Sequence, residues 1–259
     1  NGISGLNYSR AEGPPFLNAA LINIVLRTVD ALRLWASDLI GLFIPRRCAG
    51  CDTPLMRHEE CLCGPCLADL PFTRFHDDPL NPVERLFHGR VQLQAASALL
   101  QFNAHGRVQR ILHRIKYAQD TEAARFMGRL MGEALGTSAR FAGADALLAI
   151  PLHPSKQRQR GYNQSRLLCD GVREVLPLAP LHHALARGAR TETQTRKGRF
   201  DRWRNVRDAF VVRDAKALEG RHVLLVDDVV TTGATIEACA TALAAVPGVR
   251  VSLFTTACA

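Results

Sequence analysis

The sequence predicts an α/β fold in which helices flank a mostly parallel sheet, preceded by a small cysteine-rich module. Over 90–259, apolar strand-like runs alternate with amphipathic helix-like segments, a pattern typical of strand–helix–strand units. Five of the eight cysteines fall between 48 and 66, which indicates a separate module. The chain has 259 residues, 47% hydrophobic and 22% charged, and this composition suits one or two globular domains rather than a disordered chain.

The first predicted region is an amphipathic helix at 17–44. Four charged residues interrupt its apolar sequence about once per helical turn: Arg27, Asp30, Arg33 and Asp38. A membrane-spanning helix requires about 20 largely uncharged residues, so we expect no transmembrane segment here. Two interpretations remain, a helix packed on its own protein or one that binds a membrane surface or a partner.

The second region, 45–72, is predicted to be a zinc-binding module. Its two CxxC pairs are Cys48 with Cys51, and Cys63 with Cys66. Four thiolates arranged in two such pairs suit one tetrahedral, structural Zn²⁺, which would fold a segment too small to form a core alone. Cys61, or less well His58, is an alternative ligand, and redox-active or free thiols are another interpretation. Clustered CxxC pairs in a chain of this size indicate a reducing compartment, and hence a cytoplasmic location.

The third region, 90–259, carries the predicted sheet. Strands are expected at 94–102, 146–152, 222–227 and 249–255, with a weaker candidate at 209–212. Helices are expected at 107–117, 122–135, 164–175 and 235–245. The stretch 187–207 fits neither pattern and has eight basic residues against two acidic ones. Long polar loops in compact domains are often functional, so we expect this one to be a lid or a binding segment.

The most informative segment, 222–235, is a predicted buried strand that ends in Asp227 and Asp228 and leads through a turn around Gly233 into a helix. Ligands of open α/β sheets bind beyond the carboxyl ends of strands, and a helix N-terminus stabilises a phosphate. The two carboxylates would repel a phosphate but can accept hydrogen bonds from a vicinal diol. A ligand with a ribose diol and a 5′-phosphate therefore fits both halves. Neither GxxxxGK[ST] nor GxGxxG occurs, so ATPase and dinucleotide-binding functions lack their motifs.

Residues 223–235 resemble the phosphoribosyl-pyrophosphate motif of type I phosphoribosyltransferases, in which hydrophobic residues precede an acidic pair and a Thr-rich turn with Gly. By this resemblance the binding residues are Asp227, Asp228, Val229, Thr231, Thr232, Gly233, Ala234 and Thr235. The resemblance implies a type I phosphoribosyltransferase-like fold and a Mg²⁺ ion that accompanies phosphoribosyl pyrophosphate. An acidic strand end with a helix-capping Thr in an unrelated α/β protein is the other interpretation.

Two further segments are similar to the ComF (competence protein F) family. The first, 150–164, reads IPLHPSKQRQRGYNQ. The second comprises Arg190, Thr193-Gln194-Thr195, Arg199, Arg202 and Asn205-Val206. Together with the cysteine module and Ile115-Lys116-Tyr117, the resemblance covers about 45–259. It implies an N-terminal zinc module and a role in processing imported single-stranded DNA during natural transformation, but it does not settle the reaction.

Basic residues are the remaining candidates for phosphate contacts. The net charge of +9 favours an anionic partner. The segment 153–166 is predicted to be a basic loop after a strand. It contains no acidic residue, and its Lys156, Arg158 and Arg160 suit pyrophosphate or DNA phosphates, with a merely solvated loop as the alternative. Lys116 lies on a basic helix, either on a solvated face or in contact with phosphate or DNA. Related transferases have a mobile flap where 187–207 lies, which makes Arg199 and Arg202 candidate catalytic residues, with DNA contact or simple surface charge as alternatives.

The residues predict a ligand with a ribose diol and a 5′-phosphate, and the two resemblances imply a phosphoribosyl-pyrophosphate-binding protein that acts in the uptake and processing of single-stranded DNA. Its expected partners are single-stranded DNA and a competence helicase or another DNA-processing protein. A nucleobase-salvage phosphoribosyltransferase is the first alternative, although no hood that reads a base can be identified in the sequence. A non-catalytic DNA-binding sensor of phosphoribosyl pyrophosphate is the second, and whether turnover occurs is left open.

Overall fold

The computed structural model describes Ile24, Thr28, 45–188 and 209–259. The chain divides into two compact units, Asn1–Arg46 and Arg47–Ala259. The predicted helix at 17–44 therefore lies almost wholly outside the described residues, and so does the motif that includes Arg199 and Arg202. No helix in the described part of the chain is long and apolar enough to cross a membrane.

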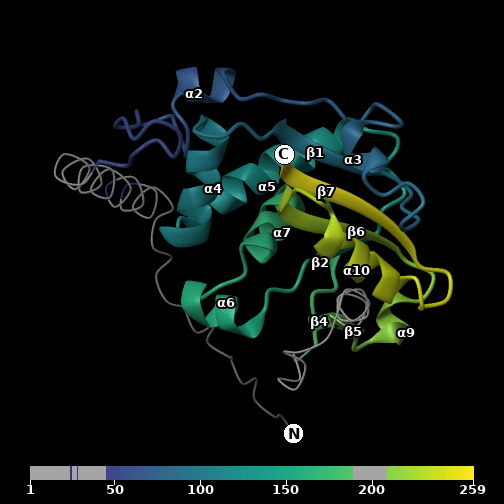
Figure 1. Ribbon diagram of the computed structural model, residues 1–259. Coiled ribbons are helices and arrows are strands. Elements are labelled where there is room, and N and C mark those ends of the chain that lie inside the picture. The colour runs from purple at the N-terminus through teal and green to yellow at the C-terminus, as the bar shows by residue number, and fades with distance from the viewer. Residues whose placement is uncertain (1–23, 25–27, 29–44, 189–208) are drawn as a thin grey trace, which may run out of the picture. The chain divides into compact units, whose positions relative to one another are not determined.

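A five-stranded sheet forms the centre of the unit 47–259 (Figure 1). In spatial order its strands are β1 (Ala96–Gln101), β7 (Arg250–Cys258), β6 (His222–Val230), β2 (Ala146–Ala149) and β3 (Ala179–Pro180). Every neighbouring pair runs parallel, which confirms the predicted sheet. Two short strands, β4 (Leu185–Arg187) and β5 (Phe210–Val212), form a separate antiparallel pair.

Helices cover both faces of this sheet (Figure 1). The longer ones are α4 (Arg107–Tyr117), α5 (Thr121–Thr137), α7 (Gln164–Val175) and α10 (Ala234–Leu243). Successive side chains of a strand point to opposite faces. Leu224 and Val226 of β6 therefore belong to the core under α4, α5 and α7, whereas Val223 and Leu225 belong to the core under α10. The flanking-helix architecture predicted from the alternating patterns is confirmed.

The described part of the chain also contains four short helices that the patterns did not predict: α2 (Gly64–Ala68), α3 (Pro82–Arg85), α6 (Pro154–Arg160) and α9 (Ala215–Leu218). The prediction that 153–166 is a loop is wrong for its first half, which is α6. His153 caps this helix by accepting a hydrogen bond from the Ser155 N–H, and Gly161 ends it at a φ of 80°. The strand predicted to end at Asp227 continues to Val230, because β6 pairs with β7 as far as Cys258.

Two glycines allow α5 and α7 to meet backbone to backbone. A Cβ atom on Gly128 of α5 would lie 2.2 Å from the carbonyl oxygen of Leu168. A Cβ atom on Gly171 of α7 would lie 2.1 Å from the carbonyl oxygen of Arg125. Any larger side chain at either position would separate the two helices. This contact fixes α7, whose first turn reaches the acidic pair of β6.

Candidate ribose-phosphate site and four-cysteine cluster

The ends of β2 and β6 meet where the chain reverses its direction across the sheet. The chain passes from β2 to β3 on one side, and from β6 to β7 on the other. The carboxyl ends of β2 and β6 therefore form a topological switch point, the usual ligand position in open α/β sheets. The segment with α6 follows β2, and the Thr-rich turn follows β6, which carries the acidic pair near its end. The two segments singled out from the sequence thus flank this switch point.

The acidic pair accepts hydrogen bonds from α7 and lies beside a cation from α4. Asp227 Oδ1 accepts from the Ser165 hydroxyl at 2.9 Å. Asp228 Oδ2 accepts from Gln164 Nε2 at 3.0 Å and lies 3.1 Å from Lys116 Nζ. Burial, and then the neighbouring Asp228, raise the pKa of Asp227 to about 7. Buried carboxylates held in this way form a preorganised set of acceptors.

Of the two interpretations of Lys116, a simply solvated helix face does not match the structure. Its side chain is only 24% exposed and lies in the ion pair with Asp228. The helix period explains the difference, because Lys116 directly follows the buried Ile115 and so stands at the edge of the packed face.

Gln164 of α7 has a buried Oε1 atom without a hydrogen-bond partner among the described residues. An unsatisfied buried acceptor is costly, and a ligand hydroxyl could satisfy it.

The turn after β6 exposes its hydroxyl residues, which are Thr231, Thr232 and Thr235. Gly233 is the N-cap of α10, with a φ of 74° that strains any residue with a side chain. No side chain in the described part of the chain caps α10. Free N–H groups at a helix N-terminus favour an anion. Of the other motif residues, Ala234 begins α10, and Val229 pairs in register with Ala257 of β7.

Side chains from the segment 82–94 support the underside of this turn. A Cβ on Gly233 would lie 2.8 Å from the Phe87 ring. Arg90 donates to the Thr232 carbonyl oxygen at 2.9 Å and also pairs with Glu237 in the first turn of α10. Glu237 alone would repel a phosphate at this helix end, and Arg90 offsets its charge. Phe87 and Arg90 lie in the linker between the cysteine module and β1, and they were not predicted because no sequence pattern there marks them.

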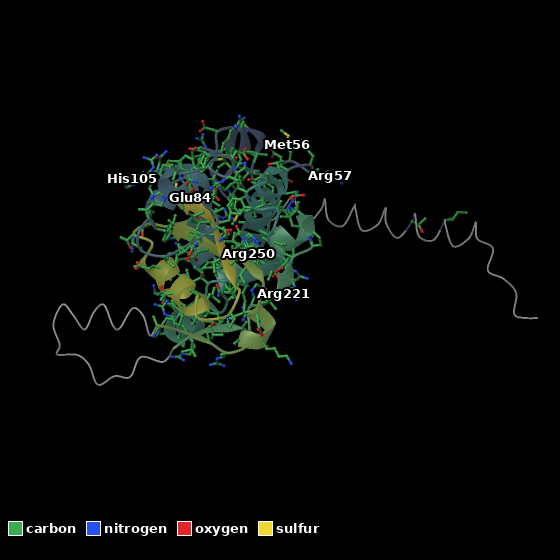
Figure 2. The ribbon with its side chains drawn as sticks, turned by 90° about the vertical axis from the view of Figure 1, so that its right-hand side faces the viewer. Met56, Arg57, Glu84, His105, Arg221 and Arg250 are labelled. Carbon is green, nitrogen blue, oxygen red and sulfur yellow. The ribbon has the colours of Figure 1, made fainter. Side chains whose placement is uncertain are left out.

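The same linker is anchored to the rest of the unit by Glu84, which is labelled in Figure 2. Its carboxylate accepts hydrogen bonds from the backbone N–H groups of Leu80 at 2.8 Å and Ala96 at 3.1 Å. It also pairs with Arg140, which follows α5. The partly buried Glu84 thereby joins α3 to the start of β1, and the linker holds Phe87 and Arg90 against the turn.

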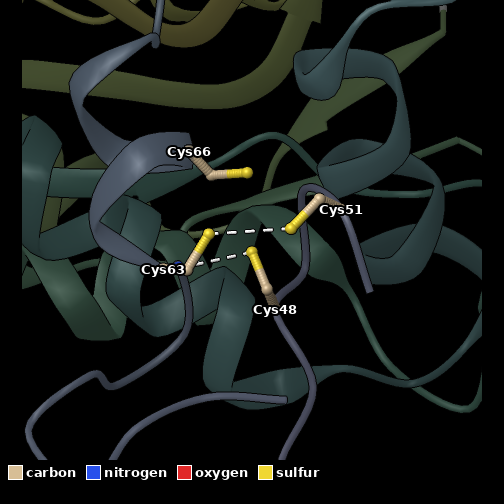
Figure 3. Close-up of side chains that lie close together, drawn as sticks. All are labelled: Cys48, Cys51, Cys63 and Cys66. Carbon is tan, nitrogen blue, oxygen red and sulfur yellow. Dashed lines mark hydrogen bonds between the residues drawn. The ribbon is translucent and has the colours of Figure 1, made fainter. Parts of the chain in front are cut away.

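Four thiols gather at the two CxxC pairs (Figure 3). They belong to Cys48, Cys51, Cys63 and Cys66, and their Sγ atoms all lie within 4.8 Å of one another. A tetrahedral zinc site with Zn–S bonds of about 2.3 Å separates its sulfurs by about 3.8 Å. The Cys51 and Cys63 sulfurs are 3.6 Å apart. Cys48 Sγ also accepts hydrogen bonds from two backbone N–H groups, as a thiolate ligand would. The cluster thus fits a structural zinc ion.

The alternative ligands Cys61 and His58 lie outside this cluster. Burial raises the pKa of the Cys61 thiol to about 12, and its side chain is part of the hydrophobic core. Within the cluster, hydrogen bonds from Thr53 lower the pKa of Cys51 to about 6, whereas burial raises the pKa of Cys66 to about 12. A bound cation would stabilise both as thiolates.

The four-cysteine module and helix α4 are packed together. Cys48, Cys66 and Leu70 share a hydrophobic core with the buried face of α4. On the surface, Arg107 pairs with Asp69, and Arg114 Nη1 lies 3.4 Å from the Cys48 carbonyl oxygen. Helix α4 therefore contacts the cysteine cluster along its length and reaches the acidic pair at its end.

The region that carries the acidic pair and the Thr-rich turn also matches a known protein family. The profile of the phosphoribosyl transferase domain matches residues 170–257. The chain is similar to the DNA utilization protein YhgH of Escherichia coli, with 33% identity over 129 residues, 49% of this chain and 56% of that protein. It is also similar to competence protein F of Haemophilus influenzae, with 37% identity over 93 residues, 36% of this chain and 41% of that protein.

Two further comparisons are weaker. Competence protein ComFC of Bacillus subtilis is 32% identical over 90 residues, 35% of this chain and 34% of that protein. A solved structure of the allosteric regulatory enzyme of purine biosynthesis matches with a TM-score of 0.40 and 18% identity over 55% of this chain and 30% of that one. The chain spans about half the length, or less, of the curated relatives that it matches.

Proposed function

We propose that this chain is a ComF-family, phosphoribosyltransferase-like protein that binds 5-phosphoribosyl-1-pyrophosphate and acts in the handling of single-stranded DNA. One observation carries the ligand proposal. A buried acidic pair and an uncapped helix N-terminus follow one another at the topological switch point of a parallel sheet.

In the proposed complex, Asp227 and Asp228 accept hydrogen bonds from the ribose diol, and the turn Thr231–Thr235 binds the 5′-phosphate. The positions support this division, because the carboxylates are buried or half-buried whereas the three threonines are exposed. Ser165 and Gln164 hold the carboxylates in place. A ligand hydroxyl would supply a donor to the same oxygens, and each hydrogen bond to a charged group contributes about 1.5–3 kcal/mol.

The pyrophosphate end of the ligand suits the segment after β2. Lys156, Arg158 and Arg160 of α6 are the cations there, which suit either pyrophosphate or DNA phosphates, and Lys116 adds a fourth beside Asp228. Mg²⁺ prefers carboxylate and phosphate oxygens, and here it would neutralise part of the pyrophosphate charge. Arg199 and Arg202, which lie outside the described residues, remain candidates for cations that close over the ligand.

The DNA part of the proposal has different support. Two relatives bear the names competence protein F and DNA utilization protein. The chain itself has a formal charge of +9, which favours binding to a polyanion. A competence helicase or another DNA-processing protein remains a candidate partner. We propose that the four-cysteine module is a zinc site and that it offers a second surface for binding DNA or that partner.

Incubation of the protein with radiolabelled phosphoribosyl pyrophosphate and Mg²⁺, with and without single-stranded DNA, tests the proposal. We expect retention of the label on the protein. Release of pyrophosphate would identify a transferase, and retention without release would identify a binding module. Absence of retention under both conditions would contradict the proposal, and turnover with a free nucleobase would favour the salvage alternative.

A further inference from the structure

Helix α4 has an exposed stripe that the ribose-phosphate site does not use. Arg110, His113 and Tyr117 are spaced three and four residues apart, so they lie along one face of the helix. All three side chains are exposed, and Tyr117 is 61% exposed. The buried face of α4, with Ile111 and Ile115, points into the core. The stripe is therefore not needed for packing.

The aromatic end of this stripe is joined by helix α6, which lies far away in the sequence. The Arg160 guanidinium stands 5.4 Å from the centroid of the Tyr117 ring, in a cation–π arrangement. The His113 ring lies 4.8 Å from the Tyr117 ring, tilted by 44°. Just after α6, the Tyr162 hydroxyl donates to the Ile115 carbonyl oxygen and ties the two helices together. The α4–α6 surface is defined here as Arg110, His113, Tyr117, Lys156, Arg158 and Arg160.

The cations of the α4–α6 surface differ from the other cations of α4. Arg107 and Arg114 form ion pairs with nearby aspartates. Among the described residues, no acidic side chain pairs with Arg110, Lys156 or Arg158. At the other end of the stripe, Arg110 and His113 line a hollow of about 340 Å³ against the first CxxC pair. Unpaired cations on the same two helices as an exposed aromatic side chain match a polyanion whose charges alternate with flat rings.

We propose that the α4–α6 surface binds single-stranded DNA, with a base stacked at Tyr117 and Arg160 and with phosphates bound by Lys156, Arg158 and Arg110. Stacking on an aromatic ring is available to every base but requires that the base be unpaired, which selects single strands over duplex. An acidic peptide would satisfy the cations but would leave the aromatic ring without a function. This proposal rests on the proposed role in DNA handling and assigns that role to named residues.

The location of this surface connects it to the ribose-phosphate site. Tyr117 directly follows Lys116, whose Nζ lies 3.1 Å from Asp228. The last turn of α4 therefore contributes one residue to each site. A strand that crosses the α4–α6 surface passes beside Asp228 and the switch point where we place phosphoribosyl pyrophosphate.

Fluorescence anisotropy with a labelled oligothymidylate tests the inference on the full chain. Tyr117→Ala should weaken binding about 5- to 100-fold, the contribution of one stacked base, whereas Tyr117→Phe should keep most of the affinity. Phe72→Ala is the matched control, because Phe72 is another exposed aromatic residue, at 47% exposure, and is not one of the residues that make up this surface. Lys156→Ala with Arg158→Ala should reduce the slope of log affinity against log salt by about 1.4, since about 0.7 is lost for each phosphate contact on a single strand.

The outcomes separate this inference from the proposed function. If the wild-type chain binds no single-stranded DNA, the proposed role in DNA handling fails. If the wild type binds but Tyr117→Ala and Phe72→Ala behave alike, the role stands and the α4–α6 surface is the wrong location. Equal affinity for duplex DNA, or higher affinity for an oligouridylate, would also overturn the inference, because it would assign the surface to another nucleic acid. Circular dichroism of each variant shows whether the fold is retained.

Discussion

Replacement of Gly128 by Ala should destabilise the protein, although the same change usually stabilises a helix. Gly128 lies inside α5, where Ala is normally favoured over Gly by about 1 kcal/mol. Here the added Cβ would lie 2.2 Å from the Leu168 carbonyl oxygen and 2.9 Å from the Gly171 Cα atom. Both obstacles are backbone atoms of α7, so neither can rotate away.

The size of the effect follows from this distance. Real Cβ contacts essentially never fall below 3.0 Å, so a Cβ at 2.2 Å forces α5 and α7 apart by about 0.8 Å. Overpacking of a well-packed core costs about 1–3 kcal/mol, and a clash of backbone on backbone belongs at the upper end. The gain in helix propensity offsets about 1 kcal/mol of this cost, so we expect the free energy of unfolding to fall by about 1–2 kcal/mol.

Urea unfolding followed by circular dichroism measures this loss, with Gly136→Ala as the control in the same helix. Gly136 is exposed, and its added Cβ would make only an ordinary contact, 3.5 Å from Leu176 Cδ2. The control should therefore be neutral or slightly stabilising. A Gly128→Ala variant as stable as the wild type would refute the close approach of α5 and α7, and with it the account of how α7 is fixed beside the acidic pair.

Three further predictions concern the two sites. Metal analysis should find one zinc per chain, and Cys48→Ser with Cys51→Ser should abolish it, because half of the ligands are lost. Arg90→Met should weaken binding of ribose 5-phosphate about 5- to 10-fold in calorimetry, because it leaves the charge of Glu237 uncompensated at the helix end. Adding Glu237→Gln to this variant should restore part of the affinity. If it restores none, Arg90 has only a structural role. Burial raises the pKa of Asp227 from 3.8 to about 7, so its contribution to stability is fully present below about pH 4 and is lost as the pH rises through 7. The melting temperature of the ligand-free wild type should accordingly fall between pH 5 and pH 8 more than that of Asp227→Asn, and equal falls would contradict this assignment.

The elements predicted best from the sequence are those whose pattern is set by their own packing. The predicted helices 107–117 and 164–175 coincide with α4 and α7, because each has a clear apolar stripe at the helical period. The end of β6 was placed three residues too early, because two aspartates look like a strand end in isolation. Pairing with β7 extends the strand, and a sequence pattern does not report the partner strand. Helix α6 was hidden for a similar reason, since it has no buried residue and thus no periodicity.

The residues of the candidate site likewise fall into two groups, those that a local sequence motif predicts and those that it does not. The acidic pair, the Thr-rich turn and the four thiols are local motifs, and their chemistry can be read from a few adjacent residues. Gln164, Ser165 and Arg90 act through tertiary contacts across 62 to 147 positions of the chain, and no local signal indicates them. Gln164 did lie in the segment similar to the ComF family, so the resemblance contained a clue to it that the residue patterns lacked.

Titration calorimetry with phosphoribosyl pyrophosphate and Mg²⁺ tests the central claim most directly. The double variant Asp227→Asn with Asp228→Asn keeps the shape of the site and removes its charge. The matched control is Asp77→Asn with Asp78→Asn, another adjacent pair of aspartates, which is exposed on a loop. Hydrogen bonds to charged groups contribute about 1.5–3 kcal/mol each, so the site variant should lose at least about tenfold in affinity while the control binds like the wild type. Unchanged affinity in the site variant, with its circular dichroism spectrum intact, would show that the acidic pair does not bind the ribose diol.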